Sequence, residues 1–153
     1  MMDEFHVSLA PRLSAVRSLS RMVEEFGDAN RLPHPKIYMV NLALDELITN
    51  SVTYGFDGVA SPRIEVTVRI DGDALVLTTV DNGRRFDPTA AAPPDVDAPV
   101  ERRPIGGLGL HIIRTFADRV TYEYENGRNR LTLEHDLNPA ASKGRRQSDE
   151  EHR

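Results

Sequence analysis

The chain contains no cysteine. Disulfide bonds, thiolate metal sites and cysteine nucleophiles are therefore excluded. Its histidines are scattered, without the i, i+4 spacing of a metal-binding helix. They are His6, His34, His111, His135 and His152. A metal centre built from cysteine or histidine is not expected.

Long hydrophobic runs and an excess of basic residues are also missing. No apolar stretch approaches the roughly 20 residues that span a bilayer, and the N-terminal MMDEFHVSLA lacks the regions of a signal peptide. The net charge is -5 and the pI is about 5.5, whereas nonspecific nucleic-acid binding needs a basic field. We therefore expect a cytoplasmic protein that binds neither membranes nor nucleic acid directly.

The 153 residues, of which 39% are hydrophobic, suffice for one ordinary core. We expect one domain over residues 1–137. The segment 138–153 is polar and mixed in charge, and is predicted to be a disordered tail.

Hydrophobic periodicity predicts the order strand, helix, helix, strand, strand, loop, helix, strand, strand. A first helix is expected from Leu13 to Phe26, with Leu13 in its buried stripe and Gly27 ending it. The other expected elements are a strand at 5–10, a helix that begins near Pro35, strands at 63–70 and 74–81, a helix at 107–117, and strands at 119–125 and 130–136.

This order predicts an α+β fold: a two-layer sandwich of one mixed, mostly antiparallel sheet with helices on one face. Asp71, Gly72 and Asp73 are predicted to form a hairpin turn. The turn of the last hairpin is assigned to residues 126–129.

The second helix carries the most informative side chains. Glu46 and Asn50 lie one turn apart in NLALDELITNSVTYGF, residues 41 to 56, on one edge of its apolar face. A carboxylate and an amide buried there need partners. Neighbouring backbone or arginine groups could satisfy them, but the motifs downstream favour a nucleotide site.

Two further motifs follow: DNGRRFDP at residues 81 to 88 and GGLGLHII at residues 106 to 113. Between them, the proline-rich residues 88–105 form an unusually long loop for a small domain, which favours a lid over a spacer. The run Gly106, Gly107, Leu108, Gly109 and Leu110 opens a helix, where backbone N–H groups and the helix dipole can bind phosphate.

In this order, the three motifs resemble the N-box and the two glycine boxes of the GHKL ATPase superfamily, which has the histidine-kinase-like, or Bergerat, ATP-binding fold. The similarity is greatest to the anti-sigma factor serine/threonine kinase branch and extends to about Leu137.

The resemblance implies ATP and Mg²⁺ as cofactors, and a role for each motif. Glu46 would be the general base and Asn50 the magnesium ligand. Asp81 would accept a hydrogen bond from the adenine amine, while Gly83 would let the backbone approach the base. Gly106, Gly107, Leu108, Gly109 and Leu110 would bind phosphate.

Arg85 departs from the pattern, because the first glycine box usually has a second glycine at this position. Arg85 could contact phosphate or face solvent. Arg102 and Arg103 could pair with phosphates or with an acidic partner surface.

Two functions from different classes follow from the resemblance. In the first, the protein is a serine/threonine kinase that phosphorylates an anti-sigma-factor antagonist, binds a sigma factor or other regulator, and forms a homodimer. In the second, it is a catalytically silent, ATP-dependent binding module. The catalytic half of a histidine kinase would need an upstream helix with a phosphoacceptor histidine, and neither His6 nor His34 has that context.

Overall fold

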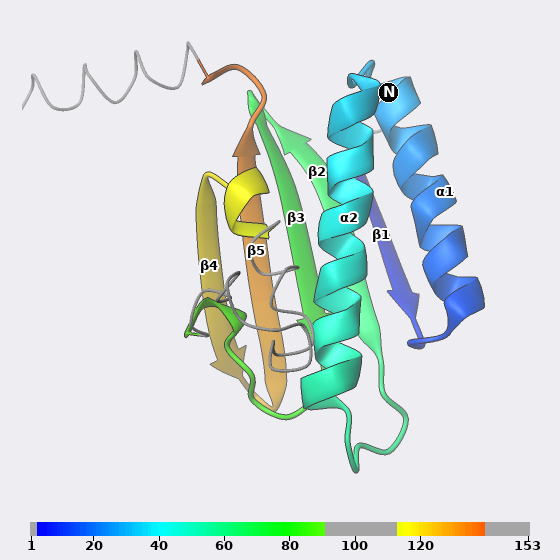
Figure 1. Ribbon diagram of the computed structural model, residues 1–153, viewed down its shortest axis with the longest axis vertical. Coiled ribbons are helices and arrows are strands. Elements are labelled where there is room, and N and C mark those ends of the chain that lie inside the picture. Colours follow the sequence, from blue (N-terminus) through cyan, green and yellow to red (C-terminus); the bar gives the residue numbers. More distant parts are fainter. Residues whose placement is uncertain (1–2, 91–112, 140–153) are drawn as a thin grey trace, which may run out of the picture.

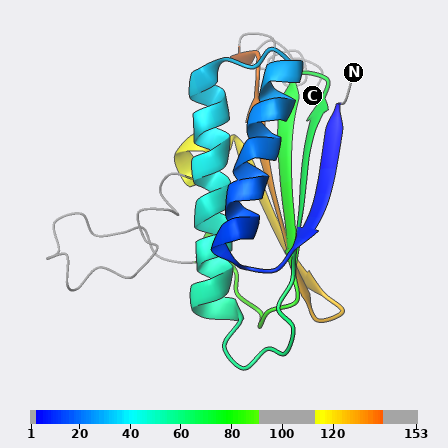
Figure 2. The same cartoon turned by 90° about the vertical axis from the view of Figure 1, so that its right-hand side faces the viewer.

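A computed structural model describes residues 3–90 and 113–139, which form two layers: a sheet and a pair of helices on one of its faces (Figures 1 and 2). The elements are β1 (Glu4–Leu9), α1 (Leu13–Ala29), α2 (His34–Asn50), a π-helical turn (Ser51–Gly55), β2 (Ile64–Asp71), β3 (Ala74–Asp81), a 3-10 turn (Pro88–Ala90), β4 (Arg119–Glu125) and β5 (Arg128–Asp136).

The five described strands have the order β1-β2-β3-β5-β4. The predicted α+β sandwich is confirmed. The sheet was expected to be mixed and mostly antiparallel; all four pairings among the described strands are antiparallel. This order places β3, which ends at Asp81, at the centre of the sheet and beside β5.

Strand alternation builds the core. In β2, Ile64, Val66 and Val68 are almost fully buried, while the residues between them are only partly covered. Leu44 of α2 and Leu77 of β3 belong to the same buried cluster. Burial of this kind contributes about 1.5–3 kcal/mol per large apolar side chain and fixes α2 against the sheet. The C-terminal end of α2 is therefore held in place relative to the end of β3.

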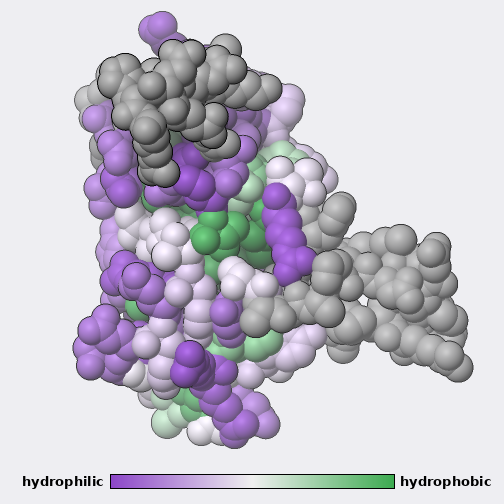
Figure 3. All heavy atoms as spheres, turned by 90° about the vertical axis from the view of Figure 1, so that its left-hand side faces the viewer, coloured by the Kyte–Doolittle hydropathy of each residue, from purple (hydrophilic) through white to green (hydrophobic). Residues whose placement is uncertain are grey.

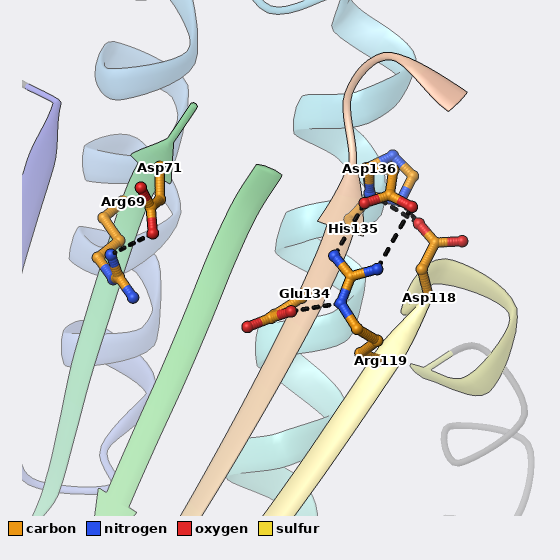
Figure 4. A network of polar contacts seen from close by, with 7 residues as sticks. All are labelled: Arg69, Asp71, Asp118, Arg119, Glu134, His135 and Asp136. Atoms are coloured by element: carbon orange, nitrogen blue, oxygen red, sulfur yellow. Dashed lines mark hydrogen bonds and ion pairs between the residues drawn. The ribbon is translucent and has the colours of Figure 1, made fainter. Parts of the chain in front are cut away.

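The edge strand β4 is tied to β5 by charged side chains (Figure 4). Arg119 donates to Glu134, with 2.5 Å between Nε and Oε2, and to Asp136, with 2.9 Å between Nη2 and Oδ1. His135 lies 3.7 Å from Asp118 and stacks on Phe116. Because the side chains of Arg119 and Glu134 are 43% and 36% exposed, their ion pair contributes little stability and mainly holds the register of the edge. The side chain of Asp136 is more deeply buried, at 13% exposed.

Both hairpins have two-residue turns. Gly72 has a positive φ of 61°, as predicted for the turn between β2 and β3. In the last hairpin, Asn126 and Gly127 both have positive φ, and pairing resumes at Glu125↔Arg128. The prediction that the turn extends to residue 129 is therefore wrong: Asn129 lies within β5.

The first helix differs from its prediction at both ends. Leu13 is 68% exposed rather than buried, because it stands at the first position of α1, outside the helix–sheet contact. Gly27 does not end the helix, which continues to Ala29. A Cβ at Gly27 would lie 2.5 Å from both Cγ1 and Cδ1 of Ile37, so glycine is needed there for the contact between α1 and α2.

Four predicted features fall largely outside the described residues. The second glycine box at 106–110 lies outside them, as does the lid segment 88–105 except for its 3-10 turn at Pro88–Ala90. The helix predicted at 107–117 is described only from residue 113, and 113–116 are helical. The tail is described only to residue 139.

Gly27→Ala is expected to lower the free energy of unfolding by about 1–3 kcal/mol, through overpacking against Ile37. At an unconstrained helix position the same change would be stabilising by about 1 kcal/mol. Urea denaturation of Gly27→Ala, Ile37→Val and the double variant measures the coupling. Because Ile37→Val removes Cδ1, it should relieve part of the cost, and strictly additive effects would contradict the clash.

Candidate functional site

The candidate site lies where α2 gives way to the π-helical turn Ser51–Gly55. The Ser51 hydroxyl is within hydrogen-bonding distance of Leu47 O, at 3.1 Å, and of Asp81 Oδ2, at 3.0 Å. Phe56 N donates to Ser51 O, which closes the wide turn. Such π-helical segments widen a helix locally and often occur at functional sites.

Asn50, the last residue of α2, is only 3% exposed, yet neither its amide nitrogen nor its amide oxygen hydrogen-bonds to a described residue. One turn earlier, Oε2 of the half-buried Glu46 also lacks a hydrogen-bond partner among the described residues. Each buried polar group of this kind costs about 1–3 kcal/mol. Among the described residues, the Asn50 amide and Oε2 of Glu46 thus lack the hydrogen bonds that a purely structural role would require.

The oxygen atoms of these two side chains are suitable ligands for a magnesium ion accompanied by phosphate. Mg²⁺ prefers hard oxygen ligands and is usually held by few protein atoms together with phosphate and water. The amide oxygen of Asn50 offers one neutral oxygen, and the carboxylate of Glu46 offers a charged one. The described residues contain no cluster of three or more histidine, aspartate or glutamate side chains that could hold a metal by itself.

Burial raises the pKa of Glu46, and the negative charge of Asp45 raises it further. Burial also raises the pKa of Asp45. A carboxylate with a raised pKa is a stronger base, so it is better matched to accepting a proton near neutral pH. The environment of Glu46 therefore favours proton acceptance.

Asp81, at the end of β3, is held by three protein donors. Its Oδ1 accepts from Gly83 N and from Asn129 Nδ2, both at 2.9 Å, and its Oδ2 accepts from the Ser51 hydroxyl at 3.0 Å. The side chain is 9% exposed. These bonds fix the carboxylate between the π-helical turn and β5.

Gly83 permits the closest backbone approach in the site. A Cβ there would lie 2.9 Å from Gly55 O and 3.0 Å from Asp81 Oδ1. Arg84 N donates to the same Gly55 carbonyl at 2.8 Å. Besides its predicted role toward a base, Gly83 thus allows the segment after β3 to dock on the π-helical turn.

Together these elements line a pocket with an empty volume of about 370 Å³, including its open mouth. Its lining residues are Leu47, Asn50, Ser51, Gly55, Thr79, Asp81, Arg84, Phe86, Pro88, Tyr122, Asn129 and Leu131. Asn50 and Asp81 therefore share one pocket. Glu46 lies one helical turn from Asn50 and is not part of this lining.

A second hollow, mainly apolar, lies nearby and is lined by Pro88, Thr89, Ile113, Arg114, Val120 and Leu131. Figure 3 views the molecule from the side that bears β4 and shows hydrophobic surface in the middle of this face, with hydrophilic surface around it. Leu131 and Pro88 line both hollows, so the second is continuous with the walls of the first.

Aromatic contacts flank the first pocket. Tyr54 stacks on Phe86 with ring centroids 4.8 Å apart. The guanidinium of Arg85 lies 5.7 Å from the ring centroid of Tyr124, within the range of a cation–π interaction. Arg85, which replaces the expected second glycine, is therefore engaged with β4.

Sequence reasoning missed five polar residues that line the pocket: Ser51, Thr79, Arg84, Tyr122 and Asn129. Ser51 was detectable, because it directly follows Asn50 and continues the same helix. Asn129 was hidden by its place in ENGRNR, two residues after the Asn126-Gly127 pair, where an asparagine is easily assigned to the turn. Thr79 and Tyr122 stand at ordinary strand positions.

Comparison with known protein families shows which domain family contains this chain. The sequence profile of the histidine kinase-like ATPase domain matches residues 9–135. The chain belongs to the histidine kinase-like ATPase domain family. Membership of this family implies ATP binding.

Named relatives are protein kinases. The chain is 31% identical over 96 residues to the serine/threonine-protein kinase BtrW of Bordetella bronchiseptica, covering 63% of this chain and 68% of that protein. It is 38% identical over 92 residues to the serine-protein kinase RsbW of Listeria monocytogenes, covering 58% of this chain and 59% of the relative. The match thus spans less than two thirds of the Listeria protein.

A solved structure supports the fold. The RsbU and RsbW domains of a Mycobacterium tuberculosis protein match with a TM-score of 0.62 and 18% identity, over 88% of this chain and 32% of that one. In the part of the chain that the structure describes, no helix is long and apolar enough to cross a membrane.

Glu46→Gln is expected to raise the melting temperature at pH 7 and above. The pKa of Glu46 is higher in the folded protein than in the unfolded chain. As pH rises between these two pKa values, the unfolded chain releases the carboxyl proton of Glu46 while the folded protein still holds it, so the free energy of unfolding falls. Glutamine cannot ionise, so the difference between variant and wild type should vanish below the ordinary glutamate pKa of about 4.3.

Calorimetry or circular dichroism from pH 4 to pH 8, in roughly unit steps, measures this pH dependence. Glu24→Gln, at an exposed position of α1, is the control. Equal pH profiles for wild type and Glu46→Gln would show that Glu46 is not perturbed by burial.

Proposed function

We propose that this protein is an ATP-dependent serine/threonine protein kinase that phosphorylates an anti-sigma-factor antagonist in a partner-switching system. When the antagonist is not available, the protein binds a sigma factor or other regulator. The observation that carries the proposal is the pairing of Glu46 and Asn50 one turn apart in a half-buried position, next to a pocket that also contains Asp81. The protein kinases among its relatives support the same activity.

Each side chain has a distinct role in this proposal. Asn50 would hold Mg²⁺ through its amide oxygen, and the ion would supply charge neutralisation for the phosphates. Asp81 would accept a hydrogen bond from the exocyclic amine of adenine, with Gly83 beside it. Gly106, Gly107, Leu108, Gly109 and Leu110, which lie outside the described residues, would bind phosphate, and residues 88–105 would act as the lid.

Glu46 would act on the acceptor substrate. Its carboxylate would orient the hydroxyl of a serine or threonine and accept its proton as the phosphoryl group is transferred. The raised pKa of Glu46 supports this role, since a group that binds its proton more tightly is a better base. Asp45 is exposed, and it would act on Glu46 only through its charge.

A second candidate is a catalytically silent module whose partner affinity depends on bound ATP. Arg85 favours this alternative, because a long side chain stacked toward Tyr124 stands where the resemblance leads one to expect glycine. ATP binding without phosphate transfer would support the module over the kinase.

The resemblance also supports a homodimer, which we propose together with a cytoplasmic location. Sedimentation velocity at micromolar concentration measures the oligomeric state, and a monomer at all concentrations would contradict the dimer.

Asn50→Ala is expected to weaken magnesium-dependent ATP binding by at least about tenfold, because it removes the proposed ligand oxygen. Isothermal titration with ATP, in magnesium and in EDTA, measures the effect. Thr49→Ala, one position away at an exposed site, is the matched control. An Asn50→Ala variant with unchanged affinity in magnesium would exclude Asn50 as the ligand.

Glu46→Gln is expected to retain ATP binding while phosphate transfer falls by about 10²–10⁴-fold, the usual contribution of a general base. The protein is incubated with labelled ATP, Mg²⁺ and candidate antagonist domains, and phosphate on a partner serine or threonine is measured. Transfer at the wild-type rate would reject Glu46 as the base. Binding without transfer by the wild-type protein would favour the silent module, and an absence of ATP binding would defeat both candidates.

A further inference from the structure

The side chain of Asn129 connects more parts of the site than any residue that the sequence motifs indicated. It is 6% exposed and lies directly opposite Asp81 in the pairing of β3 with β5. Its amide nitrogen donates to Asp81 Oδ1 at 2.9 Å and to Arg84 O at 2.8 Å. Its amide oxygen accepts from Phe86 N at 3.0 Å and from the Tyr122 hydroxyl at 2.5 Å.

We propose that Asn129 is a positioning residue for base selection. It fixes the Asp81 carboxylate relative to the backbone of residues 83–86, so that the carboxylate accepts an exocyclic amine and rejects a carbonyl at the same position of the base. The inference rests on the proposed function, because it assigns Asn129 to the adenine end of the same ATP site.

The hydrogen bonds of Asp81 determine what remains for a ligand. An ionised carboxylate has about four acceptor positions and no donor. Gly83 N and Asn129 Nδ2 both bind Oδ1, and the Ser51 hydroxyl binds Oδ2. One acceptor position is therefore left, and it is on Oδ2. A nucleobase that presents an amine there donates a hydrogen bond to Oδ2 of Asp81. A nucleobase that presents a carbonyl instead places its own acceptor oxygen against Oδ2.

The orientation of the Asn129 amide is itself determined. Its oxygen faces two donors, the Phe86 N–H and the Tyr122 hydroxyl, while its nitrogen faces three acceptors: Asp81 Oδ1, Arg84 O and, at 3.3 Å, Gly83 O. Rotating the amide by half a turn would set the NH₂ group against the Phe86 N–H and the oxygen against the carboxylate. The donor side of Asn129 therefore stays on Asp81.

Asparagine is suited to this position because it is both donor and acceptor and carries no charge. An aspartate would keep the acceptor for Phe86 N but would face Asp81 with a second negative charge. A threonine or serine has one hydroxyl proton and could not donate to Asp81 and Arg84 at the same time. The several contacts of Asn129 thus require the chemistry of an amide.

The test compares ATP with inosine triphosphate, which differs from ATP by a carbonyl in place of the exocyclic amine. Wild-type protein, Asn129→Asp and Asn129→Ala are titrated with each nucleotide in magnesium, and folding is checked by circular dichroism. Asn129→Asp is nearly the same size as the wild-type residue. Arg130→Ala, the next residue on β5 and exposed, is the control.

The wild type is expected to prefer ATP by about 10–100-fold, the discrimination that one hydrogen bond to a charged group supplies. In Asn129→Asp and Asn129→Ala the ATP affinity should fall by at least about tenfold, and the preference for ATP should approach one. Arg130→Ala should keep both the affinity and the preference.

Other results overturn the inference. If folded Asn129 variants lose ATP and inosine triphosphate affinity by the same factor, Asn129 supports the fold of the pocket without selecting the base. If the wild type binds both nucleotides equally, Asp81 does not read the amine. If the wild type binds neither nucleotide, the proposed function itself fails, and this result is distinct from the other two.

Discussion

The site depends on the buried amide of Asn50 and on Oε2 of the half-buried Glu46, both on α2, which have no hydrogen-bond partner among the described residues. Glu46 and Asn50 occupy turns of a helix whose neighbouring residues, Leu44 and Leu47, belong to the core. Packing of those residues against the sheet gives α2 no freedom to rotate the pair toward water. The hydrophobic core thus maintains a local arrangement that is unfavourable by itself, and the same rigidity fixes the two side chains relative to the pocket.

The two ends of the site differ in how far the protein satisfies its own polar groups. At Asp81, three donors from Ser51, Gly83 and Asn129 hold the carboxylate. At Asn50, no described residue supplies a hydrogen bond to the side chain. The Asp81 end is therefore rigid and suited to selecting a shape, whereas the Asn50 end offers its polar atoms to whatever enters. This division matches a nucleotide, whose base is recognised by hydrogen bonds and whose phosphates are neutralised by a cation.

Local rules predicted the elements of this fold, and long-range contacts account for what they missed. Alternation in β2 and the helical periodicity of α2 are properties of neighbouring residues, and both elements begin within one residue of their expected starts. Gly27 looks like a helix end in isolation, but its role is set by Ile37 of another helix. Asn129 likewise becomes meaningful only once β5 is paired with β3. Glu46, Asn50 and Asp81 were predicted from their motifs, whereas the hydrogen bonds that surround Asp81 join residues far apart in the chain.

Arg85 bears on the choice between a kinase and a silent module. A side chain at this position would obstruct a nucleotide if it pointed into the pocket, but its guanidinium lies over Tyr124, and Arg85 is absent from the pocket lining. The close approach to Gly55 is made instead by Gly83 and Arg84, whose backbone is fixed by Asn129 and by the Gly55 carbonyl. Loss of the second glycine therefore changes the surface beside β4 more than the pocket itself. Since Glu46 is also retained with a raised pKa, the described part of the site keeps the groups that we propose for phosphate transfer, and the kinase is the better supported of the two functions.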